Sequence, residues 1–142
     1  HNAFPKLDLQ ELDQNGKLLP SSLSFKFIKQ LLREKLNFQG LVITDDLEMG
    51  AILKNYGIGE ACKMALKAGE DMLLICANPD SVRDGYRAVL AAVQKGEISL
   101  KTVEESLQRI AHFKNLMHPP KDFNEKRLLD LSDEIKDLKK KL

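Results

Sequence analysis

The sequence of 142 residues lacks any uninterrupted run of about 18 apolar residues, so it predicts no membrane-spanning helix. It also lacks an excess of either charge. Its formal net charge of +1 gives no reason to expect nucleic acid or an anionic membrane as a partner. The opening stretch HNAFPKLDLQ has neither signal-peptide character nor an initiating methionine. We therefore expect a cytoplasmic protein whose natural N-terminus lies upstream.

Cysteines and metal-ligand patterns are also scarce. Cys62 lies in a helical pattern and Cys76 closes an apolar run, so we expect two buried, reduced thiols, with a disulfide as the alternative. His112 and His118 are expected to be surface or packing residues. No group of His, Cys and Asp has the spacing of a metal-ligand set, so the sequence predicts neither a metal site nor a cofactor.

Helical patterns, by contrast, recur along the chain. Helical periodicity or helix-start signals mark four segments before the C-terminal tail: residues 21–36, 60–67, 79–95 and one beginning at 99. Ser21 or Ser22 can cap the first segment, and Asn78 followed by Pro79 is a helix start. Residues 47–59, with three glycines, are expected to form a loop.

Two apolar runs alternate with these helical segments. Residues 41–43 and 72–76 are typical of strands buried on both faces. We expect five of their side chains to be buried in parallel strands: Val42, Ile43, Leu73, Leu74 and Ile75. Strands that alternate with helices predict an α/β chain built from parallel βαβ units. Two strands alone do not make a stable sheet, so we expect something else to cover their edges.

The first apolar run ends abruptly in Thr44, Asp45 and Asp46. In α/β barrels and open parallel sheets, functional groups lie at the carboxyl ends of strands, and this pair of carboxylates is at such an end. The alternative is structural, with one aspartate capping the next helix or pairing with a lysine. Asp71 precedes the second strand, so we expect it at the opposite end, where residues serve stability.

The wider stretch LLREKLNFQGLVITDDLEM, residues 31–49, resembles the active-site signature of glycoside hydrolase family 3. Glu48 departs from that signature, in which a small residue is usual. The form TDDLEM, without Trp after the aspartates, is similar to the β-N-acetylhexosaminidase branch, as is the opening HNAFPKLD. The resemblance continues through KAGEDMLLI and SLQRIAHFK and covers roughly residues 1–116.

This resemblance implies a retaining hydrolase of terminal β-linked N-acetylhexosamine, plausibly from peptidoglycan-derived sugars, that needs no metal or cofactor. The aspartate after Ser or Thr is the family's nucleophile, which maps to Asp45. Asp46 and Thr44 are expected to support it without reacting. His1 resembles a position that lines the sugar subsite, and Met49 is expected to pack on the sugar or its loop, with simple core packing as the alternative.

The resemblance also shows what the chain does not contain. In that branch the acid/base, a His paired with an Asp, lies on a loop early in the barrel. A Lys-His pair and an Arg hold the sugar, and this sequence contains none of those segments. A full (β/α)₈ barrel takes about 250 residues. We therefore expect residues 1–116 to be the carboxy-terminal part of a TIM barrel, and residues 117–142 to be a Pro-started, Lys-rich helical tail that is solvated rather than bound to nucleic acid.

The expected partners are a carbohydrate substrate and either the missing part of the barrel or a second copy of the chain. The rival hypothesis is a truncated barrel segment that self-associates and has no catalytic activity of its own.

Overall fold

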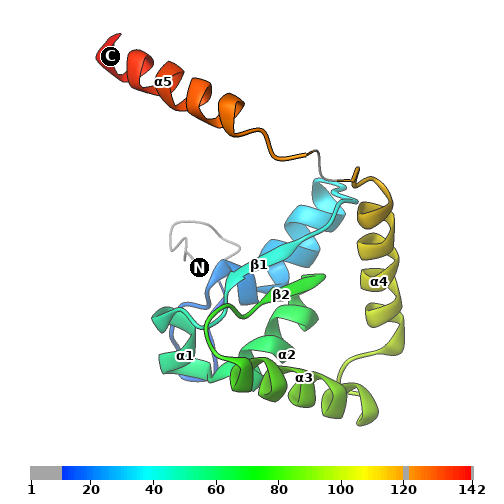
Figure 1. Cartoon of the computed structure of the whole chain (residues 1–142). Coiled ribbons are helices and arrows are strands. Elements are labelled where there is room, and N and C mark those ends of the chain that lie inside the picture. Colours follow the sequence, from blue (N-terminus) through cyan, green and yellow to red (C-terminus); the bar gives the residue numbers. More distant parts are fainter. Residues whose placement is uncertain (1–10, 120–121, 142) are drawn as a thin grey trace.

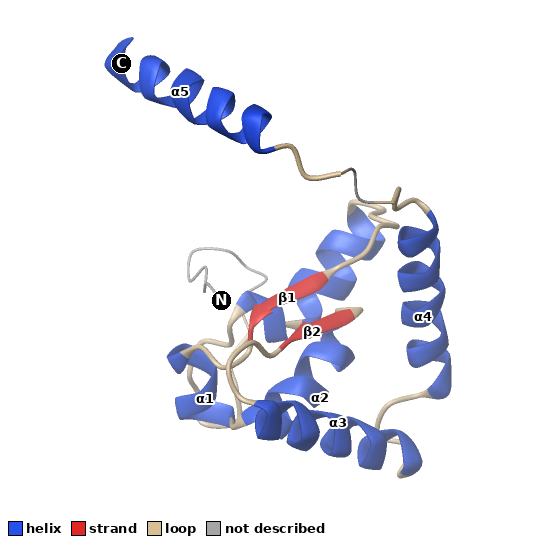
Figure 2. Ribbon diagram, viewed as in Figure 1, coloured by secondary structure: helices blue, strands red, loops and turns tan. Residues whose placement is uncertain are grey.

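The computed structural model describes residues 11–119 and 122–141, and the elements in this part of the chain alternate between helix and strand (Figures 1 and 2). In chain order they are a 3-10 turn η1 (Ser21–Leu23), a π-helical segment η2 (Lys26–Lys35), strand β1 (Ile43–Asp46), helices α1 (Gly50–Tyr56) and α2 (Ile58–Ala68), strand β2 (Met72–Leu74), and helices α3 (Pro79–Gln94), α4 (Leu100–Asn115) and α5 (Glu125–Lys141). An α/β chain is therefore confirmed.

The two strands lie side by side in parallel, as the βαβ pattern predicts (Figure 2). Ile43 is opposite Met72 and Asp46 is opposite Leu74, so β1 advances one residue more than β2 between the two pairs. At this irregularity in the register, the Thr44 hydroxyl accepts the Leu74 N–H at 2.9 Å. The backbone beyond the strand continues the ladder, because Leu47 N–H donates to the Leu74 carbonyl at 2.9 Å.

The core lies where α2 meets the sheet, α3 and the first helical turns. Its buried members are Leu19, Leu23, Leu47, Ile52, Ala61, Cys62 and Ala65. Small residues let α2 and α3 approach closely, and a Cβ on Gly85 of α3 would lie 2.8 Å from the Cys62 sulfur. Both cysteines are free, so the disulfide alternative is wrong. Cys62 is buried as expected, whereas Cys76 is exposed because β2 ends two residues before it.

The prediction that both strands are buried is wrong for part of each strand. Ile43 is 46% exposed and Leu74 is 37% exposed, while Val42, Leu73 and Ile75 are half-buried. Successive side chains of a strand point to opposite faces, and Leu73 and Ile75 pack against the helix-covered core. The other face of the sheet, lined by Ile43 and Leu74, is open in the described part of the chain.

Two of the helix predictions need correction. Residues 50–56, expected to lie in a loop, form α1, because Ile52 is fully buried in the core and fixes this short segment. The segment predicted as residues 21–36 is divided into η1 and η2, and neither Ser21 nor Ser22 caps η2, whose N-cap position is Phe25. The Ser24 hydroxyl just before it accepts the Phe27 N–H at 3.3 Å. Packing decides these details, whereas the helix starts at Asn78 and Ser99 are confirmed as side-chain caps.

Candidate functional site

Three consecutive polar residues end β1, and the pleat of the strand sends them to different faces. Thr44 is 2% exposed and is held by the Leu74 N–H, while Asp45 is exposed and Asp46 is half-buried. Asp45 therefore shares the open face with Ile43, whereas Thr44 and Asp46 point toward the covered side. The strand end presents one carboxylate to solvent from a backbone that is fixed on both sides.

The Asp45 carboxylate has one hydrogen bond among the described residues. Its Oδ1 accepts the backbone N–H of Asp46 at 2.8 Å, and no cation of the described chain forms an ion pair with it. The alternative in which Asp45 pairs with a lysine is therefore wrong for residues 11–119 and 122–141. An exposed carboxylate with one oxygen anchored by its own backbone is suited to bind or attack a ligand on the open face.

Asp46 has a different role in the geometry. Its Oδ1 accepts the N–H of Glu48 at 3.0 Å and the N–H of Cys76 at 3.3 Å. The first bond closes the turn before α1, and the second ties the end of β1 to the segment after β2. Met49, not Asp46, occupies the N-cap position of α1, and it makes no side-chain cap bond there. Asp46 thus joins the two strand ends.

Glu48 strengthens the same connection, although the sequence pattern does not indicate this role. Its carboxylate accepts the Ala77 N–H at 2.6 Å and the Asn78 N–H at 3.2 Å, just before α3. The Ala77 bond is the largest cause that lowers the pKa of Glu48, and hydrogen bonds from Ser81 and Asn78 act in the same direction, against the opposing effect of desolvation. The only signal in the sequence was that an acidic residue occupies a position where the family signature has a small one.

The remaining predicted site residues are Met49 and His1. Met49 follows the same turn and is 42% exposed, so it lies near the strand end and is not a core residue. His1 lies outside the described residues. The structure therefore brings Thr44, Asp45, Asp46 and Met49 together at one end of the sheet.

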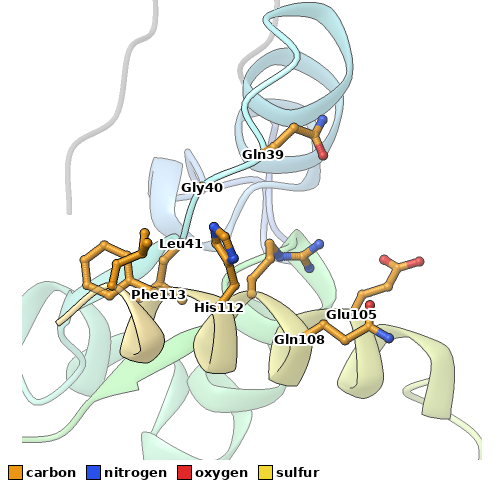
Figure 3. A pocket seen from close by; sticks show the side chains of 9 residues that line it. Gln39, Gly40, Leu41, Glu105, Gln108, His112 and Phe113 are labelled. Carbon is orange, nitrogen blue, oxygen red and sulfur yellow. The ribbon is translucent and has the colours of Figure 1, made fainter.

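Two hollows of the described surface lie away from Asp45. One of about 380 Å³ lies beyond β2 and is lined by residues from Ile75 to Arg83, on the segment that Asp46 and Glu48 hold. A larger one of about 580 Å³ lies at the opposite end of β1, where Gln39, Gly40 and Leu41 face α4 (Figure 3). His112 lines this second hollow and is exposed, as expected. We give more weight to the chemistry of the strand end, because it presents an exposed carboxylate at the carboxyl end of a parallel strand.

Asp71 marks the opposite end of the sheet, and its expected structural role is confirmed. The side chain is buried and accepts hydrogen bonds from Arg33 at 2.6 Å, from Ser106 and Arg109 at 2.9 Å each, and from the Val42 N–H at 2.9 Å. This cluster holds η2, α4 and the start of β1 around one carboxylate. This buried, fully hydrogen-bonded carboxylate has a structural role, because removing any one of its partners would destabilise the fold.

Glu70, beside Asp71, is 2% exposed, and its Oε2 has no hydrogen-bond partner among the described atoms. Burial raises the pKa of Glu70 to about 7, and the neighbouring Asp71 charge adds to this, while Arg33 opposes it. Nothing in the sequence pattern marked this residue.

Two further features bear on the functional class. Within the described ranges, no three His, Cys, Asp or Glu side chains are grouped so that they could hold a metal ion. None of the helices described in residues 11–119 and 122–141 is long and apolar enough to cross a membrane.

Comparisons with known proteins agree with this arrangement. The model of the glycosyl hydrolase family 3 N terminal domain matches residues 1–113. A beta-hexosaminidase of Haemophilus influenzae is 34% identical over 125 residues, which are 87% of this chain and 31% of that protein.

Two solved structures give the same result. A family 3 β-N-acetylglucosaminidase from a Paenibacillus species has a TM-score of 0.69 and 35% identity, over 75% of this chain and 21% of its own. The β-N-acetylglucosaminidase of Thermotoga maritima has a TM-score of 0.66 and 31% identity, over 70% of this chain and 22% of its own. The chain thus spans between 21% and 31% of the length of these relatives. It belongs to glycosyl hydrolase family 3, in the β-hexosaminidase-like branch of that family.

Proposed function

We propose that the chain is part of a retaining glycosidase that removes terminal β-linked N-acetylhexosamine from peptidoglycan-derived sugars, with Asp45 as the nucleophile. The observation that carries this proposal is the exposed Asp45 carboxylate at the carboxyl end of β1. Relatives named as beta-hexosaminidase and β-N-acetylglucosaminidase support the substrate class. The described elements are proposed to be the carboxy-terminal part of a (β/α)₈ barrel, with the open face of the sheet directed toward its interior.

The chemistry follows from the geometry of the strand end. Because the Asp46 N–H anchors Asp45 Oδ1, Oδ2 is the oxygen that forms a bond to the anomeric carbon while the bond to the leaving oxygen breaks. Water then cleaves the glycosyl-enzyme, and the two displacements together retain the configuration. Attack needs the carboxylate within about 3 to 3.5 Å of that carbon, and the bonds of Thr44 and Asp46 hold the backbone that carries it.

The proton for the leaving group comes, in this proposal, from an acid/base on another part of the barrel. A retaining glycosidase needs its two groups on opposite sides of the scissile bond, and only Asp45 has that role here. Met49, and His1 upstream of it, are proposed to contact the bound sugar.

A second candidate is a segment without activity of its own that self-associates. The exposure of Ile43 and Leu74 favours it, because these side chains and the edges of a two-stranded sheet need cover.

A chromogenic β-N-acetylglucosaminide distinguishes the two candidates. The chain alone is expected to show no turnover at an ordinary enzyme rate, since loss of proton donation to the leaving group typically costs about 10²- to 10⁴-fold. Joined to the amino-terminal part of a family barrel, it is expected to hydrolyse the substrate, and Asp45→Asn in that protein to abolish turnover. Ordinary turnover by the chain alone would mean that its acid/base lies within these 142 residues. No turnover by the completed barrel would favour the inactive segment.

A further inference from the structure

The helix α5 lies beyond residues 1–113, the part of the chain that the family domain matches. Figure 1 shows it standing away from the rest of the described chain. The hydrogen bonds and ion pairs that it forms with described residues lie within the helix or the turn before it, at Asn124. The proposed glycosidase chemistry does not involve this helix.

A continuous apolar stripe follows one face of α5. Four exposed residues form it: Leu128, Leu131, Ile135 and Leu138. Their spacings of three, four and three residues are the a and d positions of two heptads, and Leu142 continues the series in the sequence. The other positions are charged or polar apart from Leu129, so the apolar surface is a narrow seam of the kind that packs against one similar helix.

The charges beside the seam indicate which helix fits. With Leu128 at position a, Glu134 is at g and Lys139 is at the following e, five residues later. In a parallel pair of identical helices, g on one chain lies beside the following e on the other, so Glu134 would meet Lys139 of the second copy twice. Arg127 donates to Glu134 at 3.2 Å along the same flank, which keeps the Glu134 carboxylate beside the seam. In a symmetric antiparallel pair, g would face g, and the two Glu134 carboxylates would repel.

The residue types in the seam also favour a coiled coil of two helices. Ile135 at a and Leu138 at d are the combination that favours parallel dimers over larger bundles. The two prolines Pro119 and Pro120 lie between α4 and α5 in the sequence, and they disfavour one continuous helix across the two segments.

We propose that α5 is a dimerisation helix, which binds α5 of a second copy of this chain in a parallel two-stranded coiled coil through Leu128, Leu131, Ile135 and Leu138. A helix of 17 residues is short for this task, and isolated helices of such length are marginal in water. Dimerisation and helix formation in α5 are therefore coupled, and both increase with protein concentration.

The test measures the mass of the full chain by sedimentation equilibrium across the micromolar range. Ile135→Asp places a charge in the seam and is expected to raise the dissociation constant at least about 100-fold. Leu129→Asp is the matched control, because Leu129 is also exposed and lies on the same helix but at position b, outside the seam. It is expected to leave the dissociation constant within about threefold of the original. Circular dichroism verifies that the rest of the chain stays folded in each variant.

Charge exchange tests the parallel orientation. Glu134→Lys puts like charges beside Lys139 and is expected to weaken the dimer about tenfold, while adding Lys139→Glu in the same chain restores it. An antiparallel pair would show no such rescue. A chain that is monomeric throughout, a mass unaffected by Ile135→Asp, or equal effects of the Ile135 and Leu129 variants would overturn the proposal. If Ile135→Asp left the mass unchanged, the open face of the sheet would be the self-association surface. The glycosidase proposal is tested separately by the activity assay.

Discussion

Glu70 is expected to make the stability of this chain fall as the pH rises through neutrality. Burial raises its pKa in the folded state from 4.5 to about 7, and Asp71 adds to the effect. Between these two values the folded chain binds more protons than the unfolded chain, so the free energy of unfolding decreases with pH. The contribution is fully present below about pH 4.5 and is lost as the pH rises through about 7.

The size of the effect follows from the same numbers. Each pH unit between the two pKa values is worth about 1.4 kcal/mol, so a change from 4.5 to about 7 corresponds to a loss of about 3 kcal/mol. This is a large part of the 5 to 15 kcal/mol or so that stabilises an ordinary domain. The structural cause is burial, because Oε2 has no hydrogen-bond partner among the described atoms and the charge of Arg33 offsets only part of the desolvation.

Glu70→Gln removes the titration and keeps the shape. The variant is expected to lose most of the pH dependence between about pH 4.5 and 8, and to be more stable than the original chain at the upper end by up to about 3 kcal/mol. Urea unfolding followed by circular dichroism measures this at a series of pH values. Glu104→Gln is the control, because Glu104 is exposed on α4. Parallel curves for the original chain and the Glu70 variant would refute the argument.

Three further outcomes are expected. In a complete family barrel that contains these residues, Asp45→Asn reduces kcat by several orders of magnitude and Asp46→Asn by much less; the reverse ranking would contradict the assignment. Asp71→Asn destabilises the chain by about 3 kcal/mol or more in urea unfolding, because it leaves two arginines around a buried position without their counter-charge. Gly85→Ala lowers the melting temperature, since its Cβ would lie 2.8 Å from the Cys62 sulfur, and adding Cys62→Ala restores part of the loss.

Local signals explain which parts of the fold could be predicted from the sequence. Asn78 followed by Pro79, and Ser99 before an amphipathic run, fix helix starts through neighbouring atoms alone, and both occur as predicted. The loop prediction for residues 50–56 failed because glycines flank a short helix whose stability comes from burying Ile52 against distant residues. Propensity and turn residues carry no information about such tertiary packing.

Local sequence signals likewise reveal only part of the candidate site. The end of one apolar run marks the pair Asp45 and Asp46, and the family resemblance selects Asp45. The partners of Glu48, however, are 29 and 30 residues away, and those of Asp71 are up to 38 residues away. The exposure of Ile43 and Leu74 was also beyond the sequence pattern, because an apolar run indicates a strand suited to burial and does not say whether both covering layers are present.

The pleat of β1 gives a physical reason for the proposal that Asp45, and not the adjacent Asp46, attacks the substrate. Thr44 and Asp46 are on the side of the strand where backbone N–H groups of the second strand and its loop lie, and both side chains accept such bonds. A carboxylate that already bridges two loops cannot approach a sugar without releasing them. Asp45 projects from the opposite face, and its only described bond comes from its own neighbour's backbone. Two consecutive carboxylates at a strand end thus serve different purposes, because one residue of separation along a strand is a change of face.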